Sequence, residues 1–141
     1  MVSSAPAAEP LAAELVELAN ELVGRIWGHF TARAAELNLS LAEAKALQHL
    51  EPGQAMPMRA LAARLHANPS NVTVVVARLE ARRLLERQVS DDRRVKGVRL
   101  TGAGQQLKQK LEARLIADHP AVRGLSATDQ HTLLAILRRL T

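Results

Sequence analysis

Residues 89–101, Val-Ser-Asp-Asp-Arg-Arg-Val-Lys-Gly-Val-Arg-Leu-Thr, are the most informative stretch of the chain. The runs Glu86–Val89 and Gly97–Leu100 on either side have the composition of short β-strands. The tip between them is almost entirely charged, so the two strands have a polar, solvent-facing connection. The pattern predicts a short β-hairpin with a basic tip.

The segment Pro69–Arg83, just before the hairpin, has the signals of a helix. Asn68 is a good N-cap, and proline is favoured in the first turn of a helix. A shorter helix is predicted near Met58–Leu65, and the connection between the two is only three residues, as in a helix-turn-helix. A helix-turn-helix followed by a basic hairpin is typical of winged DNA-binding proteins, which place the helix in the major groove and the hairpin in a minor groove.

The rest of the chain is also predicted to be helical. An amphipathic helix with apolar residues at spacings of three and four ends near Leu37–Asn38. A capping box, Ser40–Glu43, begins a helix through Leu50, Thr101 can cap one running to about Asp118, and Ser126 can cap the last. We therefore expect a mainly α fold, a winged helix-turn-helix with a small β-hairpin wing. It would be one compact domain with an N-terminal tail and dimerisation helix (1–38), a DNA-binding lobe (39–100) and C-terminal dimerisation helices (101–141).

Composition and charge favour a nucleic-acid-binding protein over most other classes. Met58–Arg99 holds ten Lys or Arg and four Asp or Glu, a net charge of +6, whereas the remaining residues sum to −1. Phosphate binding needs such a local positive potential. Cysteine is absent, which excludes disulfides. Neither a signal peptide nor a membrane-length apolar run is readable, so we expect a cytoplasmic protein with no membrane partner.

The terminal helices carry more apolar surface than a small core can cover. The first helix has Leu11, Leu15, Leu18 and Leu22 on one stripe, and the last helix has a wide leucine-rich face. The economical interpretation is a homodimer built from the first helix and the last two. The alternative is that these helices only pack on each other within one chain.

The order of elements resembles the multiple antibiotic resistance regulator (MarR) family over nearly the whole chain. The most specific part is Leu79-Glu80-x-x-x-Leu84-Leu85-Glu86-Arg87, followed by Asp92-x-Arg94 and Val98-x-Leu100-Thr101-x-x-Gly104. The resemblance implies a dimeric transcription factor that binds a palindromic operator. It also implies that a small, often aromatic or phenolic, ligand in a cleft between the dimer region and the DNA-binding lobe releases the DNA.

Two positions depart from the family's pattern. Arg83 stands where many members have glycine at the end of the recognition helix, and a left-handed backbone there would cost a non-glycine residue about 1 kcal/mol. Val74 stands at a position that is often polar or arginine, so base reading is expected to include an apolar contact with a thymine methyl.

Candidate DNA contacts follow from this placement. Ser70, Asn71, Thr73 and Val74 begin the recognition helix, where base edges and phosphates come within reach, and Arg78 lies two turns further, within reach of a phosphate. We expect Arg94 in the minor groove and Arg93 and Lys96 on the DNA backbone. Asp92 is expected to hold Arg94 or stiffen the wing, because phosphates repel a carboxylate.

Other chemistry is poorly supported. The aromatic residues Trp27 and Phe30 are candidates for an effector cleft, although a core or dimer-interface role explains them as well. The five histidines lack paired spacing, so we expect neither metal nor cofactor. No nucleophile–base pair or glycine-rich phosphate loop is readable, so an enzyme is disfavoured. Beside a ligand-responsive repressor, two alternatives stay open: a DNA-binding regulator or architectural protein without an effector, and a winged-helix module that binds protein.

Overall fold

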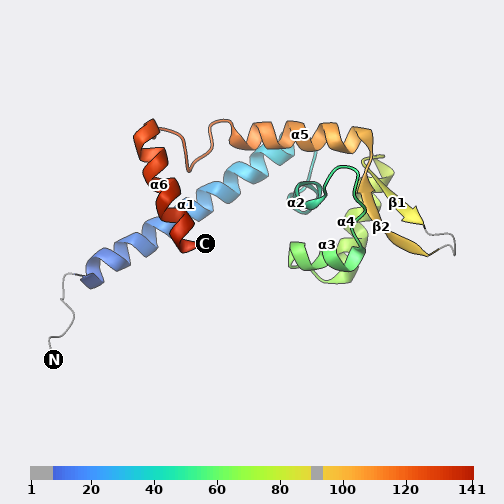
Figure 1. The fold of residues 1–141 in the computed structure, drawn as a ribbon, viewed down its shortest axis with the longest axis horizontal. Coiled ribbons are helices and arrows are strands. Elements are labelled where there is room, and N and C mark those ends of the chain that lie inside the picture. The colour runs from blue at the N-terminus through green and yellow to red at the C-terminus, as the bar shows by residue number, and fades with distance from the viewer. Residues whose placement is uncertain (1–7, 90–93) are drawn as a thin grey trace, which may run out of the picture. The chain divides into compact units, whose positions relative to one another are not determined.

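The structure, a computed structural model, describes residues 8–89 and 94–141. Within them the chain forms six helices and one two-stranded antiparallel hairpin, as the sequence predicts (Figure 1). The elements are α1 (Ala8–Glu36), α2 (Leu41–His49), α3 (Met58–Leu65), α4 (Pro69–Ala81), β1 (Leu85–Val89), β2 (Val95–Leu100), α5 (Gly102–Ile116) and α6 (Ala127–Leu140). Phe30–Ile116 is one compact unit, which extends beyond the predicted lobe of residues 39–100 at both ends. The name DNA-binding lobe refers to this larger unit below. The described residues up to His29 and from Ala117 onward form the other, called the terminal unit.

The predicted helix starts are confirmed by their capping hydrogen bonds. Ser40 Oγ accepts from the Glu43 amide at 3.2 Å, and Asn68 Oδ1 accepts from the Asn71 amide at 3.1 Å. Ser126 Oγ accepts from the amide of Asp129 at 3.1 Å in the same way. Each cap satisfies an amide that has no partner within its helix, which is why short polar side chains at these positions specify the boundaries.

The core of the DNA-binding lobe brings together apolar side chains of the five helices α1 to α5 and of the hairpin. The recognition-helix stripe that the sequence predicts is buried, and it lies among leucines of α2, α3 and α5. The fully buried large side chains are Leu47, Leu50, Leu61, Val72, Val76, Leu79, Val98 and Leu111. This packing orients α4 with one face inward and the other exposed.

Two basic side chains hold the ends of α2. Lys108 of α5 is buried, and its Nζ donates to the carbonyls of Gln48 at 3.1 Å and Leu50 at 2.6 Å. At the other end, the Arg82 guanidinium donates to the Asn38 carbonyl at 2.8 Å and lies 3.4 Å from the Glu43 carboxylate. The two contacts tie α2 to both α5 and the end of α4, because backbone carbonyls at helix ends need donors.

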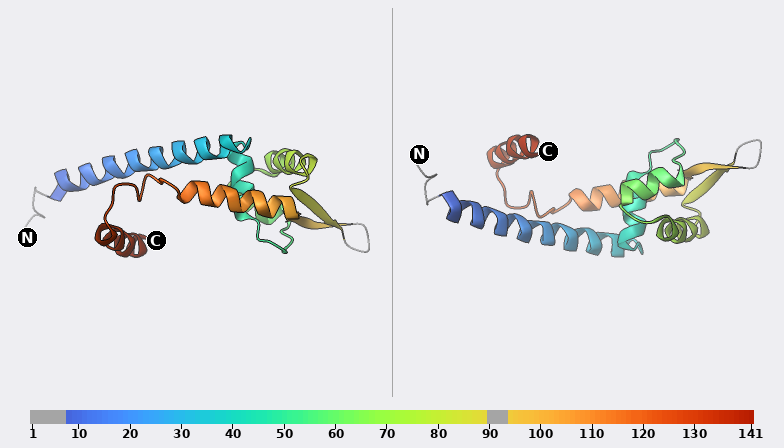
Figure 2. Two further views of the ribbon diagram at one scale, coloured as in Figure 1. Left: turned by 90° about the horizontal axis from the view of Figure 1, so that it is seen from above. Right: turned by 90° about the horizontal axis from the view of Figure 1, so that it is seen from below.

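The hairpin pairs Leu85 with Leu100 and Gln88 with Gly97, and the register shifts between Gln88 and Val89. Each strand begins earlier than the predicted Glu86–Val89 and Gly97–Leu100, β1 by one residue and β2 by two. Met56 extends the sheet by exchanging two backbone hydrogen bonds with Val98, at 2.8 and 2.9 Å. The hairpin therefore projects from the lobe on a sheet that is anchored at its base (Figure 2).

The recognition helix ends earlier than predicted, at Ala81 rather than Arg83. Arg83 has a φ of +60°, so the left-handed backbone is present and the arginine bears a cost of about 1 kcal/mol there. The Thr101 hydroxyl donates to the Arg83 carbonyl at 2.6 Å and accepts from the Gly104 amide at 3.1 Å. Thr101 thus caps α5, as predicted, and also fastens α5 to the end of α4.

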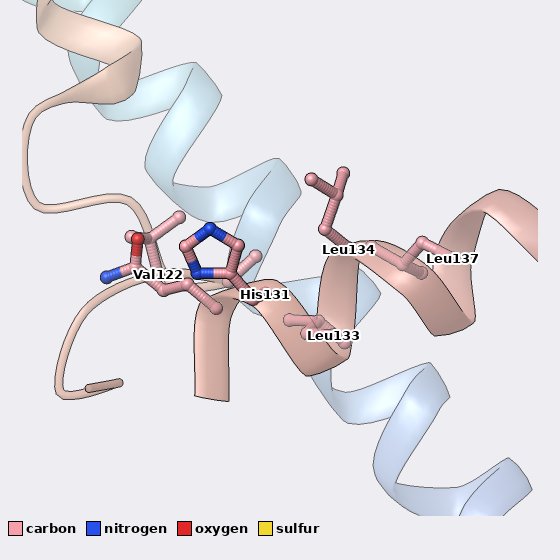
Figure 3. Close-up of a pocket in the computed structure, with 7 residues that line it drawn as sticks. Val122, His131, Leu133, Leu134 and Leu137 are labelled. Carbon is pink, nitrogen blue, oxygen red and sulfur yellow. The ribbon is translucent and has the colours of Figure 1, made fainter. Parts of the chain in front are cut away.

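The terminal unit leaves its apolar side chains in solvent. Leu11, Leu15 and Val16 are each 60 % exposed, and α6 has no buried residue. The first turns of α6 and the preceding loop form an open cavity of about 370 Å³, whose walls include Val122, Leu134 and Leu137 (Figure 3). None of the described helices is long and apolar enough to span a membrane.

The close approach of α5 to the end of α4 predicts a stability difference between two glycines. A Cβ at Gly104 would collide with the Leu84 carbonyl, whereas a Cβ at Gly102, on the same helix, meets nothing within 4 Å. We expect Gly104→Ala to lower the free energy of unfolding by about 1–3 kcal/mol, measured by urea denaturation. Gly102→Ala is the matched control and should leave stability unchanged or raise it. Equal stability of the two variants would contradict the packing described here.

Candidate nucleic-acid interface

Helix α4 presents one exposed face opposite its buried stripe. The exposed side chains of α4, listed from the N-terminus, are Pro69, Ser70, Asn71, Thr73, Val74, Ala77, Arg78 and Ala81. They include all five of the predicted contacts on this helix. The face is rich in small polar and apolar groups, and Arg78 is its only charged residue. An exposed, largely uncharged helix face beside a projecting hairpin fits base reading better than phosphate binding alone.

The first turn of α4 is held in place by its own polar side chains. Asn68 Oδ1 accepts two hydrogen bonds, from the Asn71 amide at 3.1 Å and from Ser70 Oγ at 2.7 Å. Thr73 Oγ1 donates to the Pro69 carbonyl at 2.9 Å. Two of the predicted contact residues, Ser70 and Thr73, therefore have side chains that are held by hydrogen bonds within the protein.

The predicted wing residues are only partly described. Arg94 is exposed and directly precedes β2. Asp92 and Arg93 lie outside the described residues. Lys96 lies on β2, but its side chain is likewise outside what the structure describes. The roles assigned to these four residues stay predictions.

Some of the arginines that make Met58–Arg99 positively charged form ion pairs within the lobe. Arg87 pairs with Glu80 at 3.0 Å, and Arg99 pairs with Glu86 at 2.6 Å. Arg82 donates to the α1–α2 connection, so at least three of the counted arginines have partners within the protein. The charge count therefore overstates how many arginines are left for DNA.

A second feature, a groove beside the recognition helix α4, was not predicted from the sequence. Its volume is about 460 Å³, and it lies between α2 and α4. Leu41, Leu65 and Val74 contribute apolar walls, and Lys45 and Arg78 also line it. No sequence signal would have found it, because the two helices that form it are joined by long-range packing.

The electrostatics of α2 and α3 also indicate positive potential. Partial burial lowers the pKa of His49 below its usual value, and the nearby charges of Arg64, Lys45, Lys108 and His66 lower it further. The imidazole is therefore held in its neutral form near neutral pH. The coulombic part of this shift reflects the positive charges gathered around His49.

The two candidate effector residues lie in different environments. Phe30 is buried in the core of the DNA-binding lobe, whereas Trp27, in the terminal unit, is 44 % exposed. Their assignment to a ligand cleft stays a prediction. Among the described residues, no group of three His, Cys, Asp or Glu is placed to hold a metal ion. The imidazoles of His29 and His119 make an edge-on contact, with ring centroids 5.3 Å apart.

Comparison with known proteins points to one family. The model of the MarR family matches residues 39–96, which contain α2 to the start of β2. Among curated proteins, none matches the chain.

Solved structures of this family share the fold over most of the chain. A MarR family transcriptional regulator from Silicibacter pomeroyi has 25 % sequence identity and a TM-score of 0.70, covering 97 % of this chain and 94 % of that one. A MarR family protein of Mycobacterium tuberculosis in complex with p-aminosalicylic acid has 24 % identity and a TM-score of 0.73, covering 89 % and 97 %. A mutant of MepR from Staphylococcus aureus, bound to an oligodeoxyribonucleotide, has 18 % identity and a TM-score of 0.66, covering 89 % and 94 %.

The winged helix, the matched segment and these structures agree with one another. Proteins of this family are transcription regulators rather than enzymes. The findings identify residues 39–96 as a match to the MarR family, and solved transcription regulators of that family share the fold of the chain.

Proposed function

We propose that the chain is a cytoplasmic homodimeric repressor that binds a palindromic operator and leaves it when a small molecule binds. The observation that supports DNA reading most directly is the exposed face of α4 opposite a buried stripe, with two of its side chains held by internal hydrogen bonds. A helix fixed from behind in this way can enter the major groove with its side chains already in position.

In this proposal Ser70, Asn71, Thr73 and Val74 contact base edges, and Arg78 binds a phosphate. Arg94 enters the adjacent minor groove, and Arg93 and Lys96 bind the backbone beside it. Asp92 stiffens the wing. Selection from a random duplex pool with the purified chain tests the proposal, because a sequence-specific regulator enriches a two-fold repeat. A protein-binding winged helix enriches nothing at any salt concentration.

The dimer proposal is supported by apolar surface in the terminal unit. Exposed large side chains recur along α1 from Leu11 to Trp27 and along α6 from Leu134 to Leu140. A monomer rarely leaves so many such residues in solvent, and a two-fold interface would cover them.

The effector is proposed to be a small aromatic or phenolic compound. The related protein from Mycobacterium tuberculosis was solved with p-aminosalicylic acid, a compound of this class. Trp27 and Phe30 are the proposed cleft residues. Titrating p-aminosalicylic acid and other aromatic carboxylates into the protein–operator complex tests release. A regulator without an effector would hold the operator at every concentration.

Arg94→Ala and Thr73→Ala are predicted to impair DNA binding in different ways. Arg94→Ala should weaken binding to all sequences and reduce the magnitude of the salt slope by about 0.9 per site, or about two units per dimer. Thr73→Ala should keep the salt slope but lose about 1–3 kcal/mol of discrimination at one base pair. Fluorescence anisotropy with operator and random duplexes, repeated over a range of salt, measures both quantities. Unchanged affinity and slope in both variants would contradict the placement of helix and wing.

Leu15→Glu is predicted to weaken the dimer without unfolding the chain. Leu15 is 60 % exposed, so a charge there costs the monomer little but would be buried in the proposed interface. Ala13→Glu, which adds the same charge beside Glu14 and Glu17 on the acidic side of α1, is the matched control. Sedimentation at micromolar concentration should show dissociation for Leu15→Glu only. A monomeric wild-type chain would rule out the dimer.

A further inference from the structure

We propose that α4 reads A·T base pairs, with Ser70 and Thr73 acting only as hydrogen-bond acceptors for adenine amino groups. The inference rests on the proposed function, since it assumes that α4 enters the major groove. It adds the chemical class of base that this helix selects.

The proton of the Ser70 hydroxyl is already committed. Asn68 Oδ1 accepts from the Asn71 backbone amide at 3.1 Å, which identifies that atom as the carbonyl oxygen of the side chain. Ser70 Oγ lies 2.7 Å from the same oxygen, so the hydroxyl must be the donor in that contact. Ser70 Oγ keeps only its lone pairs for a ligand.

The hydroxyl proton of Thr73 is also committed, through a separate hydrogen bond. Its Oγ1 lies 2.9 Å from the Pro69 carbonyl, which can only accept. The hydroxyl proton therefore points back along the helix, and the lone pairs of Oγ1 remain on an exposed side chain. The two positions are three residues apart, so both acceptors lie on one face of α4.

Acceptor-only hydroxyls restrict what can be read. In the major groove the only base donors are the amino groups of adenine and cytosine, whereas guanine presents two acceptors. Phosphate oxygens are acceptors as well, so neither hydroxyl suits the DNA backbone while its internal bond is kept. Ser70 and Thr73 thus select an amino-bearing base.

The surrounding side chains favour adenine over cytosine. Thr73 has a methyl group beside its acceptor, Val74 is 49 % exposed, and Ala77 is exposed one turn after Thr73. Such apolar groups match the thymine methyl, which only an A·T pair offers. Asn71, also exposed, has the amide that pairs with adenine, and no arginine or lysine precedes Arg78 on this face to read guanine.

The test combines protein variants with base analogues. The wild-type chain first enriches a binding site from random duplexes, and Thr73→Val, which removes the acceptor but keeps the shape, identifies the base pair that Thr73 reads. At that pair, adenine is then replaced by purine, which lacks the amino group, or thymine by uracil, which lacks the methyl. Thr73→Ser keeps the acceptor and removes the methyl.

The matched control is Thr132→Val in α6. Thr132 is exposed, and its hydroxyl bonds the Thr128 carbonyl at 3.1 Å, as Thr73 bonds that of Pro69. Thr132→Val therefore removes an equivalent hydroxyl-to-carbonyl hydrogen bond from a helix other than α4. This control should bind the selected duplex with wild-type affinity.

We expect the pair whose preference changes in Thr73→Val to be A·T. Replacing adenine by purine there should weaken wild-type and Thr73→Ser binding roughly tenfold but leave Thr73→Val unaffected. Replacing thymine by uracil should weaken the wild type more than Thr73→Ser.

Two outcomes would overturn the inference alone: a selected G·C pair at the Thr73 position, or wild-type binding that is indifferent to the loss of the adenine amino group. Failure of the folded wild-type chain to enrich any sequence would instead overturn the proposed function, and this inference with it.

Discussion

The contact between the Leu84 carbonyl and Gly104 is the constraint on which the DNA-binding lobe depends. There the end of α4, the start of β1 and the first turn of α5 meet, and only a glycine leaves room for the carbonyl. Thr101 closes the junction by bonding the Arg83 carbonyl and the Gly104 amide, and its own amide donates to Leu84 at 3.1 Å. Helix and hairpin are thereby fixed to each other, so the lobe can present both to DNA as one surface.

This junction explains the spacing of the family motif that runs from Leu79 to Gly104. The motif residues Leu84, Thr101 and Gly104 are up to 20 positions apart in the sequence but meet in the structure. Arg83 adopts the left-handed conformation that the family's glycine allows, with φ of +60°. The cost to a non-glycine residue is small beside the packing that the junction permits, so the fold tolerates the arginine.

Features set by local chemistry were predictable from the sequence, and features set by distant contacts were not. The caps at Ser40, Asn68 and Ser126 depend on residues three positions away, so their patterns sufficed. Lys108 bonds carbonyls about 60 residues earlier, and Arg82 bonds one 44 residues earlier, which no periodicity reveals. At the site, the residue types on α4 can be read from the sequence, but the direction of each hydroxyl proton depends on contacts in the folded chain. The same holds for which arginines form ion pairs within the protein.

In the proposed arrangement, α4 and the hairpin bind adjacent grooves of one DNA duplex, once from each half of a two-fold assembly. Hydroxyl-radical footprinting of the intact chain on its selected duplex tests it most directly. The expected result is two symmetric half-sites whose centres are about 10 base pairs or a multiple apart, each with protection extending into a flanking minor groove. A single asymmetric protected patch, or half-sites without minor-groove protection, would contradict it.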